Sequence, residues 1–307
     1  MAGRIVTVLA GLIAQCLHIV MMMAAAPTLA GIIGGLQARL TGRTGPPILQ
    51  PWRELTRLHR KHSVVAESAS RISGFAPSAC LAALATAAWL VPSFARGMIL
   101  APFADVVLIA GLLALARCAQ ALLATDAGTA MGGIAASRTM LLGCGTDMAL
   151  LLAAFAFGLA AGTTNVDQIV GLQFDSTSSL LPAAAAIALA GLVDASVLRE
   201  EPLSLELSGT DLAFIEAAGM LRLLLWFNLL GAALVPFGMA TADAGPAAWL
   251  LGLASWLVRT ALFALGVAIL RATQERLRLK CATGMLGIAM LLGVLAIVLL
   301  FSTMRTA

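Results

Sequence analysis

Residues 45–65 read GPPILQPWRELTRLHRKHSVV, a basic stretch with three prolines in a chain that otherwise consists mainly of long apolar segments. Seven of the 19 lysines and arginines lie between Arg39 and Arg71, around this stretch. Such a cluster beside apolar segments fixes the orientation of a membrane protein, because basic loops stay on the cytoplasmic side. The stretch therefore indicates a cytoplasmic loop between two membrane spans.

The composition is that of an integral membrane protein. Of the 307 residues, 61% are hydrophobic and only 11% are charged, and the mean hydropathy is +0.98. Globular domains carry about 25% charged residues. The apolar segments are long and lack the period of two that marks the strands of a membrane β-barrel. We therefore expect an all-α integral membrane protein with one transmembrane domain over residues 1–307.

Eight segments qualify as membrane-spanning helices, which need roughly 20 mostly apolar residues. They lie at about 5–35, 75–95, 102–124, 140–161, 180–198, 221–240, 247–270 and 284–303. The first is too long for the apolar part of a signal peptide, so we interpret it as an uncleaved span. The sequence thus predicts a bundle of about eight transmembrane helices, with a basic loop at 37–74 and an acidic loop at 199–220, both cytoplasmic.

The distribution of basic residues predicts the orientation. With the amino terminus outside, 14 of the lysines and arginines, Arg222 among them, fall in inside loops and only three fall outside. This bias places both termini on the periplasmic side of a bacterial inner membrane. The net charge of +4 is a consequence of these loops, so nucleic acid is not an expected partner.

The basic loop contains a short amphipathic pattern. Pro51 suits the first turn of a helix, and Trp52, Leu55 and Leu58 follow at a spacing of three with basic residues on the other face. We expect a helix on the inner membrane surface, where it either contacts only lipid headgroups or docks a soluble partner with an acidic surface. The candidate docking residues are Gln50, Trp52, Arg53, Arg57, Arg60, Lys61, Arg138, Glu200 and Glu201.

The acidic loop is the counterpart of the basic one. It contains five of the 15 acidic residues, among them Glu200, Glu201 and Glu206. These carboxylates are either ordinary solvated loop charges or a proton-accessible patch, with Glu206 the candidate relay residue.

Several charges lie within or at the ends of the spans. Because ionisable groups are costly in lipid, they normally face the bundle interior and pair. Arg117 and Asp147 fall at nearly the same depth of two antiparallel spans, so we expect them to pair. Asp126, Asp194 and Arg259 complete the group. Structural ion pairs and a proton relay both remain open for these residues.

The chain offers no nucleophile with a base, no phosphate-binding loop and no metal site. Its five cysteines are not paired at metal-ligand spacing, and its three histidines are too few for a bis-His haem between helices. We expect the chain to bind no cofactor or metal and not to be a catalyst by itself.

Several motifs resemble those of the membrane subunit family shared by complex I and the group 4 [NiFe] hydrogenases. They occur in the same order along most of the chain. The resemblance is strongest to the formate hydrogenlyase subunit 4 and hydrogenase-4 component C type. The segment 45–51 with the helix after it is similar to the family's Gly-Pro-Pro-Leu-Leu-Gln-Pro motif. Further matching stretches are 114–117, 125–128, 135–138, 163–166, 206–209, 212–216 and 220–222.

The resemblance implies a cofactor-free anchor subunit. It would hold hydrogenase-like large and small subunits and an iron–sulfur protein at the inner membrane face, and those partners would carry the [NiFe] centre and the clusters. It also implies that the acidic residues help couple the redox step to proton movement through neighbouring antiporter-like membrane subunits.

The chain departs from the family in two places. Thr139 stands where the family usually has Glu, and a cytoplasmic block is missing before Glu200, where Asp194 stands in place of a family Glu. Two alternatives therefore stay open, a stand-alone transporter of a small solute and a scaffold without ion transport.

Overall fold

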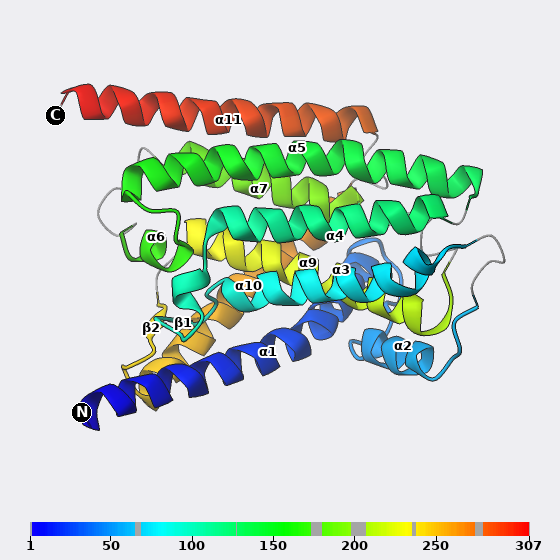
Figure 1. Ribbon diagram of the computed structural model, residues 1–307, viewed down its shortest axis with the longest axis horizontal. Helices are drawn as coiled ribbons and strands as arrows, with labels where there is room; N and C mark the ends of the chain where they lie inside the picture. Colours follow the sequence, from blue (N-terminus) through cyan, green and yellow to red (C-terminus); the bar gives the residue numbers. More distant parts are fainter. Residues whose placement is uncertain are drawn as a thin grey trace.

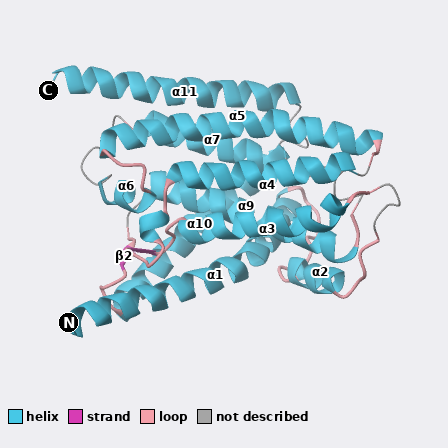
Figure 2. Ribbon diagram, in the orientation of Figure 1, coloured by secondary structure: helices cyan, strands magenta, loops and turns pink. Residues whose placement is uncertain are grey.

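The computed structural model describes residues 2–64, 69–126, 128–172, 180–197, 207–234, 238–273 and 279–306, and these are almost entirely helical (Figures 1 and 2). The helices are α1 Ala2–Leu40, α2 Gln50–His59, α3 Arg71–Leu90, α4 Val106–Asp126, α5 Ala130–Ala161, α6 Val166–Leu172, α7 Leu181–Val197, α9 Gly209–Leu234, α10 Pro246–Thr273 and α11 Leu279–Thr306. A short 3-10 helix, η1, covers Ala101–Phe103, and two short strands, β1 Ala95–Arg96 and β2 Ala240–Thr241, pair in parallel.

Seven helices in the described part of the chain are long and apolar enough to cross a membrane, which confirms the predicted all-α membrane fold. The predicted fifth span is α7, whose apolar part, Leu181–Ala195, is shorter than the others. It packs against α5, α9 and α11 within the bundle. Each of the eight predicted spans thus corresponds to a helix, and α7 lies near the lower length limit for a membrane-spanning helix.

The spanning helices are arranged around α9, the most buried of them (Figure 1). It contacts α1, α3, α7 and α10, while α11 packs on α5 and α7. Large side chains on the outer faces of α1, α10 and α11, such as Val20, Leu251 and Leu291, are exposed, as lipid-facing residues should be.

The two chain ends lie at one end of the bundle, together with α6 and the strands, and α2 lies at the other end (Figure 1). This agrees with the expected placement of both termini on one side of the membrane and of the surface helix on the other. The pairing of β1 with β2 ties the α3–α4 connection to the α9–α10 connection at the first of these ends.

Helix α2 is the predicted amphipathic surface helix. It begins beside Pro51 and packs on α9 and α1. Leu58 is buried and Trp52 and Leu55 are half-buried, whereas Arg53 and Arg57 are exposed. The apolar positions at a spacing of three therefore face the bundle and the basic positions face outward.

Two predicted boundaries were wrong. Residues 130–139 were assigned to a loop, yet α5 begins at Ala130, because Thr129 caps it and the hydroxyls of Ser137 and Thr139 bond to carbonyls within the helix. Residues 209–220 of the expected acidic loop are helical. They form the first turns of α9, in which the polar residues alternate with apolar ones. The short elements α6, η1, β1 and β2 were not predicted.

Candidate functional site

Arg117 lies near the middle of α4 and is only 2% exposed. A guanidinium at this depth needs partners, because a charge in a low-dielectric interior is stable only when it is paired and hydrogen-bonded. Its partners come from α5 and α7, the two helices that lie beside α4 and behind it in Figure 1.

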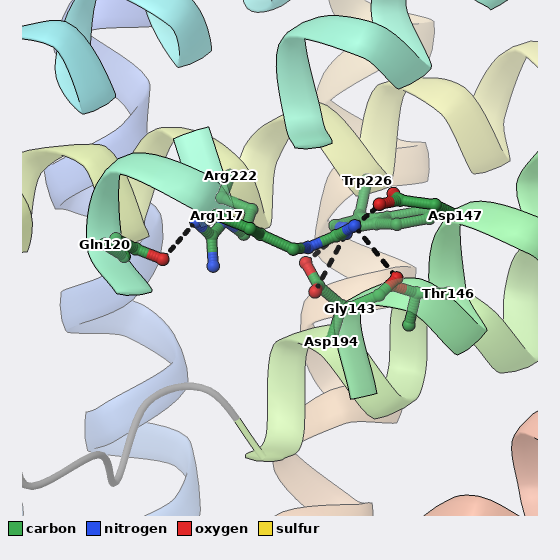
Figure 3. A network of polar contacts seen from close by, with 8 residues as sticks. All are labelled: Arg117, Gln120, Gly143, Thr146, Asp147, Asp194, Arg222 and Trp226. Atoms are coloured by element: carbon green, nitrogen blue, oxygen red, sulfur yellow. Dashed lines mark hydrogen bonds and ion pairs between the residues drawn. The ribbon is translucent and has the colours of Figure 1, made fainter. Parts of the chain in front are cut away.

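The predicted pairing of Arg117 with Asp147 is confirmed (Figure 3). Nη1 donates to Asp147 Oδ1 and, at 3.2 Å, to the carbonyl oxygen of Gly143 one helical turn away on α5. Nη2 donates to Asp194 Oδ1 on α7 at 3.2 Å. One cation therefore bridges two carboxylates that belong to different helices.

The two carboxylates are held differently. Asp194 is 3% exposed, and both of its oxygens accept hydrogen bonds, because Trp226 Nε1 of α9 donates to Oδ2 at 2.6 Å. The side chain of Asp147 is 19% exposed, and only its Oδ1 is bound to Arg117. Asp194 is thus held by side chains of two other helices, whereas Asp147 is bonded to Arg117 and stays partly exposed.

A second arginine lies beside this network. Arg222 of α9 is 4% exposed, and its Nη2 donates to Gln120 Oε1, one turn along α4 from Arg117, at 2.7 Å (Figure 3). The assignment of Arg222 to a cytoplasmic loop was therefore wrong, because α9 begins well before it. Two buried arginines thus lie beside one buried carboxylate, Asp194, and one partly exposed carboxylate, Asp147, so the cluster is formally neutral.

Two glycines make room for the network. A methyl group on Gly143 would lie 2.6 Å from Cδ of Arg117, and one on Gly191 of α7 would lie 2.8 Å from the ring of Trp226. Both distances are far below ordinary contact, so any larger residue would displace a member of the network.

Sequence reasoning missed Gln120, Arg222 and Trp226. Gln120 and Arg222 are polar residues in otherwise apolar helices, and this signal was available. Trp226 gave none, because a tryptophan in an apolar span equally suits a lipid interface.

Other predicted residues lie apart from this network. Asp126 ends α4 and accepts hydrogen bonds from the Ser70 amide, at 2.9 Å, and from the Ser73 hydroxyl, so it joins the end of α4 to the start of α3, where Ser70 is the N-cap. Arg259, near the middle of α10 as expected, donates to Ser93 O at 2.9 Å. The imidazole of His18 also forms a hydrogen bond with Ser93, and its Nδ1 lies 2.8 Å from Ser93 Oγ.

The docking candidates lie in three parts of the chain. Gln50, Trp52, Arg53 and Arg57 lie on α2, Arg60 caps its end and Lys61 follows. Arg138 lies on α5, about two and a half turns before Asp147, and is half-buried. Glu200, Glu201 and Glu206 lie outside the described residues. Within the described ranges, no group of three or more His, Cys, Asp or Glu side chains is placed to hold a metal ion.

The sequence model of the family described as NADH dehydrogenase matches residues 13–303, a range that includes the whole network. The chain belongs to the NADH dehydrogenase family. Two relatives from Escherichia coli K12 confirm the resemblance inferred from the motifs. Formate hydrogenlyase subunit 4 is 28% identical over 84% of this chain and 88% of its own length. Hydrogenase-4 component C is 27% identical over 72% of this chain and 74% of its own length.

A solved structure shares the fold of this NADH dehydrogenase family member. It is described as the membrane-bound sulfane sulfur reductase, an archaeal respiratory membrane complex. The alignment covers 93% of this chain and 98% of the other chain, with a TM-score of 0.77 and 21% identity. The arrangement of spanning helices around α9 is therefore that of a known membrane fold.

Proposed function

We propose that this chain is the membrane subunit of a hydrogenase-like, complex I-related respiratory assembly. Family membership and the two hydrogenase-type relatives, one aligned over 88% of its length, support this function. In such an assembly the electron-transfer chemistry belongs to partner subunits, and this chain supplies a membrane anchor and buried ionisable groups.

Docking of a soluble module would take place at the end of the bundle that carries α2. This end presents the exposed Arg53 and Arg57 on a helix whose apolar face is fixed to α9. Basic groups on a rigid helix favour a partner with an acidic surface. The partners that we propose are hydrogenase-like large and small subunits and an iron–sulfur protein, which would hold the [NiFe] centre and the clusters, with antiporter-like subunits alongside in the membrane.

A part in proton translocation rests on one observation, the bridge from Asp147 through Arg117 to Asp194. When Asp147 binds a proton, Arg117 loses one of its two counter-charges and is drawn towards Asp194. When Asp147 releases the proton, the bridge is restored. Protonation at Asp147 would thereby change contacts between α4, α5 and α7, which is how a local charge can be coupled to a movement of helices.

We place the assembly in a bacterial inner membrane with both termini of this chain on the periplasmic side. The excess of basic residues in the expected inside loops supports this orientation, as does the position of α2 at the end of the bundle opposite to the two termini (Figure 1).

The test of the assembly is purification of the tagged chain in mild detergent from its own host. We expect hydrogenase-like and iron–sulfur subunits to copurify, and a variant with Arg53→Glu and Arg57→Glu to lose them while remaining in the membrane. Asp243→Asn, at an exposed turn near β2, is the control. A chain that purifies alone and moves a solute in liposomes would instead support the transporter, and the proposal would fail.

A further inference from the structure

A groove of about 390 Å³ runs between α2 and α9, at the end of the bundle that carries the surface helix. Its volume is within the roughly 300–1,000 Å³ of ordinary ligand pockets. Leu81 of α3 also lines the groove, ten residues after α3 begins at Arg71, which corresponds to about 15 Å along the helix. The groove therefore extends from the surface helix towards the depth of the spans.

The walls of the groove are mainly apolar. Trp52 and Leu55 of α2 face Phe214 and Ala217 of α9 across it. Thr56 adds a hydroxyl, but this hydroxyl donates to carbonyl oxygens of its own helix and is not directed to a ligand. An occupant must therefore supply an apolar chain to this part of the groove.

The polar end of the groove is basic. His59 and Arg60 line it at the end of α2, and the His59 ring packs edge-on to Phe214, with ring centroids 6.2 Å apart. Among the described residues, Arg60 has no carboxylate partner, whereas Arg57 on the outer face is bound to Glu54. Arg60 is thus a cation beside an apolar slot and lacks a counter-charge there.

An apolar slot with a cation at its mouth, on the surface side of a membrane-spanning bundle, suits an anionic amphiphile with an apolar chain. We propose that this groove binds one acyl chain of an anionic phospholipid, with the lipid phosphate at Arg60 and His59. Basic pockets beside membrane helices bind anionic headgroups in this way. The lipid would fill the space between α2 and α9, and the exposed Arg53 would stay free for another partner.

The site is independent of the proposed redox assembly, because all of its lining residues belong to this chain. A bound lipid would fix α2 against α9, whereas a helix that only rests on the membrane surface needs no slot. The basic end of the groove also predicts that an anionic phospholipid binds more tightly than a zwitterionic one. A zwitterionic lipid offers the same acyl chain but has no net negative charge.

Trp52 provides the signal that tests this proposal. Lipids with brominated acyl chains quench tryptophan fluorescence on contact, so the purified full-length chain in detergent is titrated with brominated phosphatidylglycerol or brominated phosphatidylcholine. Trp52→Phe gives the contribution of the other four tryptophans, and the difference reports the groove. We expect phosphatidylglycerol to bind about fivefold more tightly than phosphatidylcholine, the effect of one basic group.

Three variants identify the residues involved. Arg60→Gln should remove the preference for phosphatidylglycerol, while Arg53→Gln, an equal change of charge outside the groove, should leave it intact. Ala217→Phe should fill the groove and abolish the Trp52-dependent quenching by both lipids, with its folding checked by size-exclusion chromatography. Equal quenching by the two lipids, equal effects of Arg60→Gln and Arg53→Gln, or no quenching of Trp52 at all would each overturn the proposal.

Discussion

Arg117 Nη2 lies 3.2 Å from Asp194 Oδ1, and Asp194 Oδ2 accepts a hydrogen bond from Trp226 at 2.6 Å. Three helices, α4, α7 and α9, thus meet at one carboxylate. Asp147 joins the same arginine from α5 but is partly exposed. Asp194 therefore joins three helices, whereas Asp147 joins α5 to α4 and is the carboxylate for which we propose proton exchange.

Removal of Asp194 should therefore destabilise the protein more than removal of Asp147. Asp194→Ala leaves the Trp226 N–H without an acceptor and Arg117 with one counter-charge, at a cost of about 3–5 kcal/mol. Asp147→Ala should cost about 1–3 kcal/mol, because Asp194 still pairs with Arg117. Unfolding in mixed detergent micelles measures the free energy of unfolding of both variants. Equal losses of stability in the two variants would contradict the structural role assigned to Asp194.

Gly143→Ala should disturb the network without changing any charge. Its methyl group would lie 2.6 Å from Cδ of Arg117, so the arginine must shift, at a cost of about 1–3 kcal/mol. Gly133→Ala on the same helix meets nothing within 4 Å and should be neutral or stabilising by up to about 1 kcal/mol. Indistinguishable unfolding curves for the two variants would show that Arg117 does not depend on this glycine.

Ser208 joins the start of α9 to the segment that follows α2. Its hydroxyl accepts from the Val64 amide at 2.8 Å and lies 3.2 Å from the Val64 carbonyl oxygen. Ser208→Ala should therefore speed hydrogen exchange of the Val64 amide about fivefold, as expected for one lost hydrogen bond. Ser78→Ala is the control, because the Ser78 hydroxyl donates only within α3. Unchanged exchange in Ser208→Ala would mean that this contact does not restrain the segment.

Asp167 of α6 should make stability depend on pH. Burial raises its pKa above the ordinary value of 3.8, against the opposing effects of the Gly97 amide and Arg96. The folded state therefore binds the proton more tightly than the unfolded state, so this contribution is fully favourable below pH 3.8 and is lost as pH rises through the raised pKa.

Asp167→Asn keeps an acceptor for the Gly97 amide and should remove this loss. Its stability relative to the native chain should increase as pH rises through the weakly acidic range, in unfolding curves recorded at several pH values. Asp243→Asn, at an exposed turn, serves as the reference. A difference between Asp167→Asn and the native chain that is constant with pH would contradict the assignment.

Much of the fold could be predicted because spans are a property of local composition. The apolar runs, the surface helix after Pro51 and the pairing of Arg117 with Asp147 all follow from the hydrophobic pattern and the cost of charge in lipid. The start of α5 and the first turns of α9 were missed, because their polar residues suggested loops although the hydroxyls bond within the helix.

The rest of the network depends on tertiary packing. The contact of Trp226 with Asp194 requires α7 and α9 to approach across Gly191, and no local pattern encodes that approach. The contact of Asp126 with Ser70 and Ser73 likewise depends on how the end of α4 meets the start of α3, and the relay role of Asp126 stays a prediction. The cytoplasmic orientation of the basic loop stays a prediction.

We propose that protonation of Asp147 couples this subunit to proton movement. The most direct test of this proposal is proton uptake by inverted membrane vesicles that contain the assembled complex with Asp147→Asn, compared with Asp243→Asn. We expect the Asp147 variant to assemble and to transfer electrons normally but to lose most of its proton uptake. Normal proton uptake in that variant, with assembly intact, would contradict the account.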